Sequence, residues 1–239
     1  MAAKEKIILA LDVSSEDQAL ELVRELKDSV GAFKVGLELF NSTGPRVFEA
    51  LRDAGAERIF YDGKFHDIPN TVAGAARAAA RMGLWMFNVH ASGGSAMLKA
   101  AAEAAADEAD RQGIEPPIAV GVTVLTSISE HMLHDELGVP ALMENQVTRL
   151  ARLAQSSGLR GVVCSPREIV PVKSACGSSF IVVTPGIRPD WAAAHDQRRI
   201  MTPAQAICLG VDYLVIGRAI TDADDRSEAA RRILEEIGG

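Results

Sequence analysis

The residues best suited to chemistry lie in one short stretch, DGKFHD at 62–67, at the end of an apolar run. Asp62 and Lys64 are two residues apart, and Asp67 follows three residues later. Residues two apart in a strand point to the same face, so Asp62 and Lys64 are predicted to lie side by side. Asp67 at the turn would complete an acid–base–acid cluster, and Lys34, from a neighbouring apolar run, can join it.

A fixed ammonium among carboxylates can donate a proton and stabilise a developing negative charge. The alternative is a buried ion-pair network with a purely structural role. Such networks stabilise a fold poorly, because desolvation consumes most of the Coulomb gain. The cluster therefore favours a catalytic interpretation.

A second group of residues is suited to binding an anion. The segments TPGIRP at 184–189 and VIGRAI at 215–220 each combine a glycine with an arginine. Arg188 and Arg218 can form bidentate hydrogen bonds to a phosphate. Gly217, without a side chain, lets an anion approach the backbone. The alternative is two surface arginines beside turn glycines.

The elements that must position these residues follow a regular alternation of strands and helices. The apolar runs are nearly continuous, which is typical of strands covered on both faces, and they alternate with amphipathic segments. The predicted strands are 7–13, 33–39, 58–64, 85–91, 118–125, 161–165, 180–185 and 213–217. The predicted helices are 15–29, 45–54, 69–81, 96–111, 141–156, 168–175, 203–209 and 226–237.

Eight strand–helix units in 239 residues predict an α/β protein with a single (β/α)8 TIM barrel, one domain spanning 1–239. A doubly wound open sheet is the alternative, but it usually carries a glycine-rich turn after its first strand, where this chain has LDVSSE. In a barrel, function lies at the carboxyl ends of the strands. The polar residues expected there are Asp12, Lys34, Asp62, Lys64, Asp67, His90, Thr126, Ser127, Arg188 and Arg218.

Composition excludes several other classes of protein. A formal net charge of −7 argues against binding a nucleic acid polymer, which requires a basic surface. No apolar stretch approaches the roughly 18 residues of a membrane span, and the first apolar run, which Asp12 ends, is too short for the apolar region of a signal sequence. With three unpaired cysteines in the sequence, we expect a soluble, cytoplasmic protein.

Two other polar groups favour structural interpretations. His131 and His134 lie near Asp135 and Glu136, but in a polar helix-like segment without a further ligand from a strand end, so no metal site is expected. Cys164 ends a strand with no base nearby and is interpreted as a core thiol rather than a nucleophile.

In combination, these motifs match one known family. The stretch DGKFHDIPNT at 62–71 resembles the DxKxxDIPNT signature of the orotidine 5′-phosphate decarboxylase family, bacterial type. TPGIRP and VIGRAI are similar to its two phosphate-side motifs, and LALD at 9–12, FKVG at 33–36, NVHA at 88–91 and VLTS at 124–127 match in order. Gly63 stands where the family more usually has a larger apolar residue. Strand alternation predicts that residue 63 points away from the barrel interior, so the difference should affect packing and not the reaction.

The resemblance implies cofactor-independent decarboxylation of orotidine 5′-monophosphate to UMP in de novo pyrimidine biosynthesis, with no metal. Lys64 would protonate C6 of the substrate, flanked by Asp62 and Lys34. The residues implied to reach across a homodimer interface into the neighbouring, shared active site are Asp67, Ile68 and Thr71. The other implied substrate contacts are Asp12 and Lys34 to ribose, Thr126 and Ser127 to the pyrimidine edge, and Arg188, Gln197, Gly217 and Arg218 to phosphate, with Pro185 beside them.

Two alternative functions remain open at this point. A related barrel that uses a similar Asp-x-Lys-x-x-Asp pattern on sugar phosphates would be a Mg²⁺-dependent aldolase or epimerase, which EDTA would inactivate. A non-catalytic nucleotide-binding module would bind UMP without turnover. The DIPNT continuation argues against the first, and the intact set of Asp62, Lys64 and Asp67 argues against the second.

Overall fold

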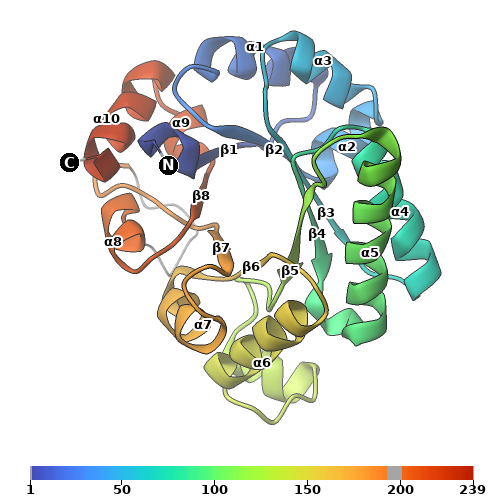
Figure 1. Cartoon of the computed structure of the whole chain (residues 1–239). Coiled ribbons are helices and arrows are strands. Elements are labelled where there is room, and N and C mark those ends of the chain that lie inside the picture. The colour runs from blue at the N-terminus through green and yellow to red at the C-terminus, as the bar shows by residue number, and fades with distance from the viewer. Residues whose placement is uncertain (1, 193–200, 239) are drawn as a thin grey trace.

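Eight parallel strands close into a barrel in the order β1 to β8, with β8 pairing back onto β1 (Figure 1). The computed structural model describes residues 2–192 and 201–238. The strands are β1 (Ile7–Leu11), β2 (Ala32–Val35), β3 (Ile59–Phe65), β4 (Met86–His90), β5 (Ile118–Val122), β6 (Gly161–Val163), β7 (Ile181–Thr184) and β8 (Tyr213–Ile216). The predicted (β/α)8 TIM barrel is confirmed.

The helices form a ring outside the strands (Figure 1). The α-helices are α1 (Glu16–Leu26), α2 (Leu37–Thr43), α3 (Val47–Asp53), α4 (Pro69–Arg81), α5 (Gly94–Gln112), α6 (Met143–Ser156), α7 (Ile169–Cys176), α8 (Pro203–Cys208), α9 (Arg218–Thr221) and α10 (Arg226–Gly238). Short helical turns occupy Ala3–Lys6, Ala91–Gly93, Met132–Glu136 and Pro166–Glu168. In the described part of the chain, no helix is both long and apolar enough to cross a membrane.

The helix starts follow from local chemistry. Ser15 precedes α1, and its side chain accepts a hydrogen bond from the backbone N–H of Gln18 at 3.4 Å, which satisfies one of the unpaired donors of the first turn. Pro69 is the first residue of α4, where its missing N–H costs nothing. Both starts agree with the sequence prediction.

Strand alternation divides the apolar residues into two cores. One parity packs outward against the helices, as Leu9, Phe87 and Leu214 do. The other parity fills the barrel interior with residues such as Phe60 and Met86. Near-complete burial of both faces explains why the strands read as continuous apolar runs.

The inward parity turns polar at the carboxyl end of the barrel. Four polar side chains lie two residues beyond the apolar interior residues of their strands, and they are Asp12, Lys34, Asp62 and Asn88; on β8 the corresponding position is Gly217. An apolar floor therefore carries a polar layer at the end of the barrel where catalytic groups are placed in this fold.

The predicted strand 33–39 is too long. β2 ends at Val35, and α2 begins at Leu37 after Gly36. Leu39 is fully buried in the outer core, so its apolar character reflects helix packing rather than strand continuation. The apolar run alone could not separate the two cases, because both bury the same kind of side chain.

Candidate active site

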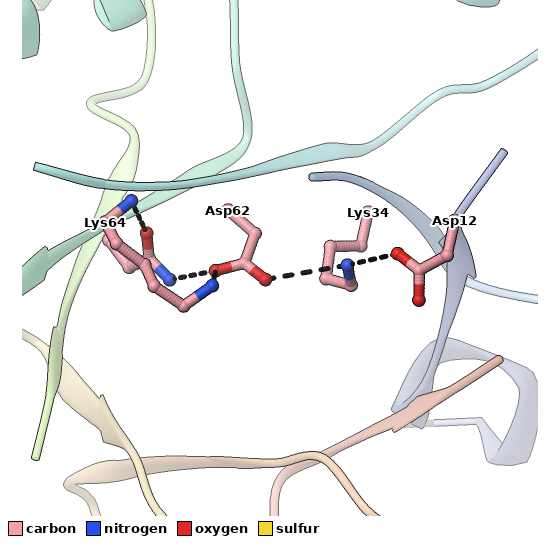
Figure 2. Close-up of polar contacts among 5 residues, drawn as sticks. Asp12, Lys34, Asp62 and Lys64 are labelled. Carbon is pink, nitrogen blue, oxygen red and sulfur yellow. Dashed lines mark hydrogen bonds and ion pairs between the residues drawn. The ribbon is translucent and has the colours of Figure 1, made fainter. Parts of the chain in front are cut away.

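Four charged side chains of alternating sign form a row along one wall of the barrel mouth (Figure 2). Lys34 Nζ lies 2.9 Å from Asp12 Oδ1 and 3.5 Å from Asp62 Oδ2. Asp62 Oδ1 lies 2.7 Å from Lys64 Nζ. The row joins β1, β2 and β3, so it depends on the pairing of these three strands.

Asp62 and Lys64 lie together as predicted, but β3 is not a regular strand there. Tyr61 pairs with Phe87 and Phe65 pairs with Val89, so β3 uses two more residues than β4 over this interval. Lys64 has a φ of 47°, and it is the only residue other than glycine with positive φ in the described part of the chain. The bulge, rather than simple alternation, thus brings the ammonium back to Asp62.

Asp62 is held as a carboxylate. Burial would raise the pKa of this carboxyl, but the charges of Lys34 and Lys64, with hydrogen bonds from Lys64 and Asn88, lower it below its usual value. Asp62 is therefore ionised at neutral pH and presents a negative charge to both neighbouring lysines.

The charged row lines a cavity of about 310 Å³, within the size range of small-ligand sites. The predicted site residues that line it are Asp12, Lys34, Asp62, Lys64, Thr126, Pro185, Arg188, Gly217 and Arg218. Apolar side chains complete the walls, among them Phe60, Val122, Val163 and Val215. The row of alternating charges, an apolar floor and two arginines thus share one cavity.

The β7 and β8 ends provide the expected features of an anion site. Arg188 is only 4% exposed, so its guanidinium is held in place by the surrounding protein. At Gly217, a Cβ would lie 3.4 Å from the Cβ of Ala10 and 3.7 Å from Asp12 Oδ2. A larger residue at this position would therefore narrow the cavity between β8 and Asp12.

Four predicted site residues do not line this cavity, and one cannot be placed. Asp67, Ile68, Thr71 and Ser127 are exposed, and Gln197 lies outside the described residues. Asp67 Oδ1 accepts a hydrogen bond from the backbone N–H of Ile68 at 2.6 Å, and it makes no ion pair with Lys64. The acid–base–acid cluster predicted from spacing is therefore not formed within one chain, because the turn after β3 directs Asp67 outward.

Asn88 was not singled out from the sequence as a site residue. Its side chain is 1% exposed and contacts both Lys64 and Asp62. Its position could have identified it, because Asn88 is a polar residue at an inward-facing place on an otherwise apolar strand. A buried amide without a hydrogen-bond partner is costly, so a polar partner was to be expected there.

Three further titratable side chains, His66, His90 and Cys164, lie near the site. The rings of His66 and His90 are 5.3 Å apart. Burial, and then the charges of His66 and Lys64, lower the pKa of His90, with Asp62 opposing. Burial also raises the pKa of the Cys164 thiol strongly, which agrees with a core thiol. No group of three or more potential metal ligands occurs among the described residues.

Comparisons with known proteins agree with this geometry. The sequence model of the "Orotidine 5′-phosphate decarboxylase / HUMPS family" matches residues 5–233. The chain is 49% identical over 237 residues to an orotidine 5′-phosphate decarboxylase of Heliobacterium modesticaldum, covering 99% of this chain and 97% of the relative. It is 52% identical to that of Moorella thermoacetica, covering 99% and 94%. The crystal structure of the Lactobacillus acidophilus decarboxylase superposes with a TM-score of 0.86 at 38% identity, covering 98% and 99%.

Proposed function

The chain belongs to the orotidine 5′-phosphate decarboxylase / HUMPS family, and we propose that it decarboxylates orotidine 5′-monophosphate to UMP with Lys64 as the proton donor to C6. It is a carboxy-lyase of pyrimidine biosynthesis. The observation that carries the proposal is the row Asp12–Lys34–Asp62–Lys64 in one cavity with the buried Arg188. Full-length relatives near 50% identity support the substrate.

The chemical problem is the carbanion that forms when CO₂ leaves. The bond between C6 and the carboxylate carbon breaks, and its electron pair remains on C6 with little resonance relief. A fixed ammonium next to C6 stabilises this charge and then transfers a proton to it, and water later restores the lysine. Lys64 suits this role because its Nζ lies 2.7 Å from Asp62 Oδ1, which holds the ammonium in place. We propose that no metal or organic cofactor takes part.

Substrate phosphate and ribose contacts supply the positioning. Arg188, Gly217 and Arg218 surround the phosphate in this proposal, and Asp12 with Lys34 binds the ribose hydroxyls. Pro185 lines the phosphate side and Thr126 contacts the pyrimidine edge in this proposal, whereas Ser127 does not line the cavity in this structure. Binding energy gained at the phosphate, which does not react, can hold C6 against Lys64.

The charged row also weighs against a Mg²⁺-dependent aldolase or epimerase. Asp12 and Asp62 are the carboxylates of the cavity wall, and both pair with Lys34. A carboxylate engaged with an ammonium is a poor metal ligand, because the cation would have to displace that ammonium. A protein that only binds nucleotide has no need of this row, because partly burying paired charges costs desolvation energy and does little to stabilise the fold.

The test is an absorbance assay with purified protein and orotidine 5′-monophosphate, run with and without excess EDTA. We expect the absorbance of the orotate ring to fall at the same rate in both samples. Loss of turnover in EDTA would favour the metal-dependent reaction. Binding of UMP without any turnover of orotidine 5′-monophosphate would favour the non-catalytic module.

We further propose a homodimer with shared active sites. Ile68, which follows β3, is 67% exposed, and Leu37, which follows β2, is 50% exposed, so two large apolar side chains lie on the surface beyond the ends of these strands. Asp67 and Thr71 are exposed beside Ile68 at the start of α4. These positions support contacts from one subunit to its partner's cavity, where Asp67 would approach the partner's lysine.

We also propose that the enzyme acts in the cytoplasm. Cys164, Cys176 and Cys208 are all free thiols, which fits a reducing compartment.

A further inference from the structure

We propose that Asn88 is a positioning residue for this decarboxylation: its carboxamide holds the backbone of Lys64 in its left-handed conformation and fixes the Asp62 carboxylate that aims the Lys64 ammonium. Asn88 does not line the cavity, so it acts through these two residues. The inference rests on the proposed function and deepens it.

The carboxamide has a donor at one end and an acceptor at the other, and both are used. The backbone N–H of Lys64 donates to Asn88 Oδ1 at 2.7 Å. Asn88 Nδ2 donates to Asp62 Oδ1 at 2.6 Å. A backbone amide can only donate and an ionised carboxylate can only accept, so the partners fix which way the carboxamide points. Asn88 is 1% exposed, and water cannot easily replace it.

The backbone contact lies where the strand ladder is interrupted. Between the pairs Tyr61–Phe87 and Phe65–Val89, the bulge leaves the Lys64 N–H without a regular ladder partner on β4. A buried N–H requires an acceptor, and Asn88 Oδ1 is that acceptor. Lys64 has a φ of 47°, a conformation that residues with side chains rarely adopt and that surrounding contacts must hold.

The carboxylate contact decides where the ammonium points. Asp62 Oδ1 accepts from both Asn88 Nδ2 and Lys64 Nζ, while Oδ2 faces Lys34 at 3.5 Å. Without the Asn88 donor, Asp62 can rotate toward Lys34 and away from Lys64. Asn88 thus sets both the backbone and the terminal nitrogen of the same lysine.

The first variant is Asn88→Ala. We expect kcat to fall roughly 10- to 100-fold, as misplacement of a reacting group does. The KM and the dissociation constant of UMP should change by less than about threefold, because the phosphate and ribose contacts remain. Wild-type kcat in the folded fraction, with only a lower melting temperature, would overturn the proposal.

The second variant, Asn88→Asp, has nearly the same shape and keeps the molecule testable if the alanine variant does not fold. As a carboxylate, Asp at 88 cannot donate to Asp62 and repels it. As a neutral acid it again has one donor and one acceptor, as the carboxamide does. Burial beside Asp62 raises the pKa of such an acid, so protonation begins well above the usual range.

The expected signature is a pH-dependent rescue. The ratio of Asn88→Asp activity to wild-type activity should rise at least about fivefold from pH 8 to pH 5, whereas the Asn88→Ala ratio stays flat. The groups facing position 88 are Asp62 and Lys64 from β3, with Lys34 and His90 nearby, and β5 carries no titratable side chain. These groups are present in wild type and in both variants, and both variants lack the Asn88 donor to Asp62, so comparing Asn88→Asp with Asn88→Ala isolates the acid introduced at position 88.

A flat ratio for Asn88→Asp, or full activity of this variant at pH 8, would contradict the positioning role. Failure of the wild type to turn over orotidine 5′-monophosphate would instead contradict the proposed function. The two failures are therefore separate results.

Discussion

Lys34 is the side chain that contacts both carboxylates of the cavity wall, Asp12 at 2.9 Å and Asp62 at 3.5 Å. This arrangement lets two carboxylates lie in one partly buried cavity, because each has an ammonium beside it. It also leaves Lys64 with Asp62 as its ion-pair partner within the chain. At the scale of residues, the site is a row of alternating charges that begins at Asp12 and ends at Lys64, the proposed proton donor.

Arg218→Ala should act mainly on substrate affinity. A hydrogen bond to a charged group is worth about 1.5–3 kcal/mol, so KM should rise roughly 10- to 100-fold. Steady-state kinetics with orotidine 5′-monophosphate measures this effect, and the unphosphorylated nucleoside is the control, for which the variant should lose little. A variant that changes only the melting temperature would show that Arg218 has a structural role.

His90 should make the fold sensitive to mild acid. The pKa of His90 is lowered in the folded chain, chiefly by burial and then by His66 and Lys64. As pH falls through about 6.5, the unfolded chain takes up the proton first, so the free energy of unfolding decreases until the pH lies below the folded pKa. Between pH 7.5 and 5.5, wild type should therefore lose more thermal stability than His90→Gln. Equal losses would contradict this assignment.

At the scale of elements, β3 carries Asp62 and the proposed proton donor Lys64, and its pairing with β4 is where the ladder departs from regularity. The presence of a strand here was readable from the sequence, and so was the juxtaposition of Asp62 and Lys64. Two features were not. The bulge is set by pairing with β4, and spacing does not show where the turn directs Asp67. Asn88 belongs to the NVHA match at 88–91, but that match gave it no role, although its inward position on an apolar strand was available as a signal.

Helix and strand boundaries were predictable where turn chemistry marks them, as at Ser15 and Pro69. The predicted end of β2 was wrong, because an apolar run continues past Gly36 into α2. Here tertiary packing of Leu39, rather than local pattern, decides the element.

Gly63 has a packing reason on β3. A Cβ there would lie 2.7 Å from Tyr61 Cζ and 3.1 Å from Phe65 Cε1. The Tyr61 ring is already fixed against Phe40 and Phe48, with centroids 4.7 and 5.4 Å away. The tyrosine thus fills the space that a larger residue at 63 would need.

We therefore expect Gly63→Ala to lower the free energy of unfolding by roughly 1–3 kcal/mol, the usual cost of overpacking. In a Tyr61→Leu background the same substitution should cost markedly less, since the clashing ring is gone. Urea denaturation of the four proteins in this cycle measures the coupling. Additive effects would show that Gly63 is required by something other than Tyr61.

At the scale of the whole molecule, closure of the barrel brings the two ends of the sequence into one site. β1 pairs with β8, so Asp12 and Arg218 line the same cavity although they are separated by most of the chain. This was predictable from counting strand–helix units, because eight units close a barrel. Subunit assembly was not predictable in this way, because surface side chains follow no comparable periodicity.

Mixing two inactive variants tests the proposed dimer. Lys64→Ala and Asp67→Asn subunits should each be inactive alone. Equal amounts pair at random, about half of the dimers are mixed, and each mixed dimer has one intact shared site, so about a quarter of wild-type activity should return. Differently tagged subunits prove exchange. No recovery in a sample with proven exchange would indicate that each chain holds a complete site.

Lys64→Ala, assayed for both turnover and binding, tests the central claim most directly. We predict that kcat for orotidine 5′-monophosphate falls by roughly 10⁴-fold or more, because proton donation and charge stabilisation are lost together. UMP should still bind through the phosphate and ribose contacts, and the circular dichroism of the barrel should be unchanged. Turnover within about tenfold of wild type, in a folded variant that binds UMP, would contradict the assignment of Lys64 as the proton donor.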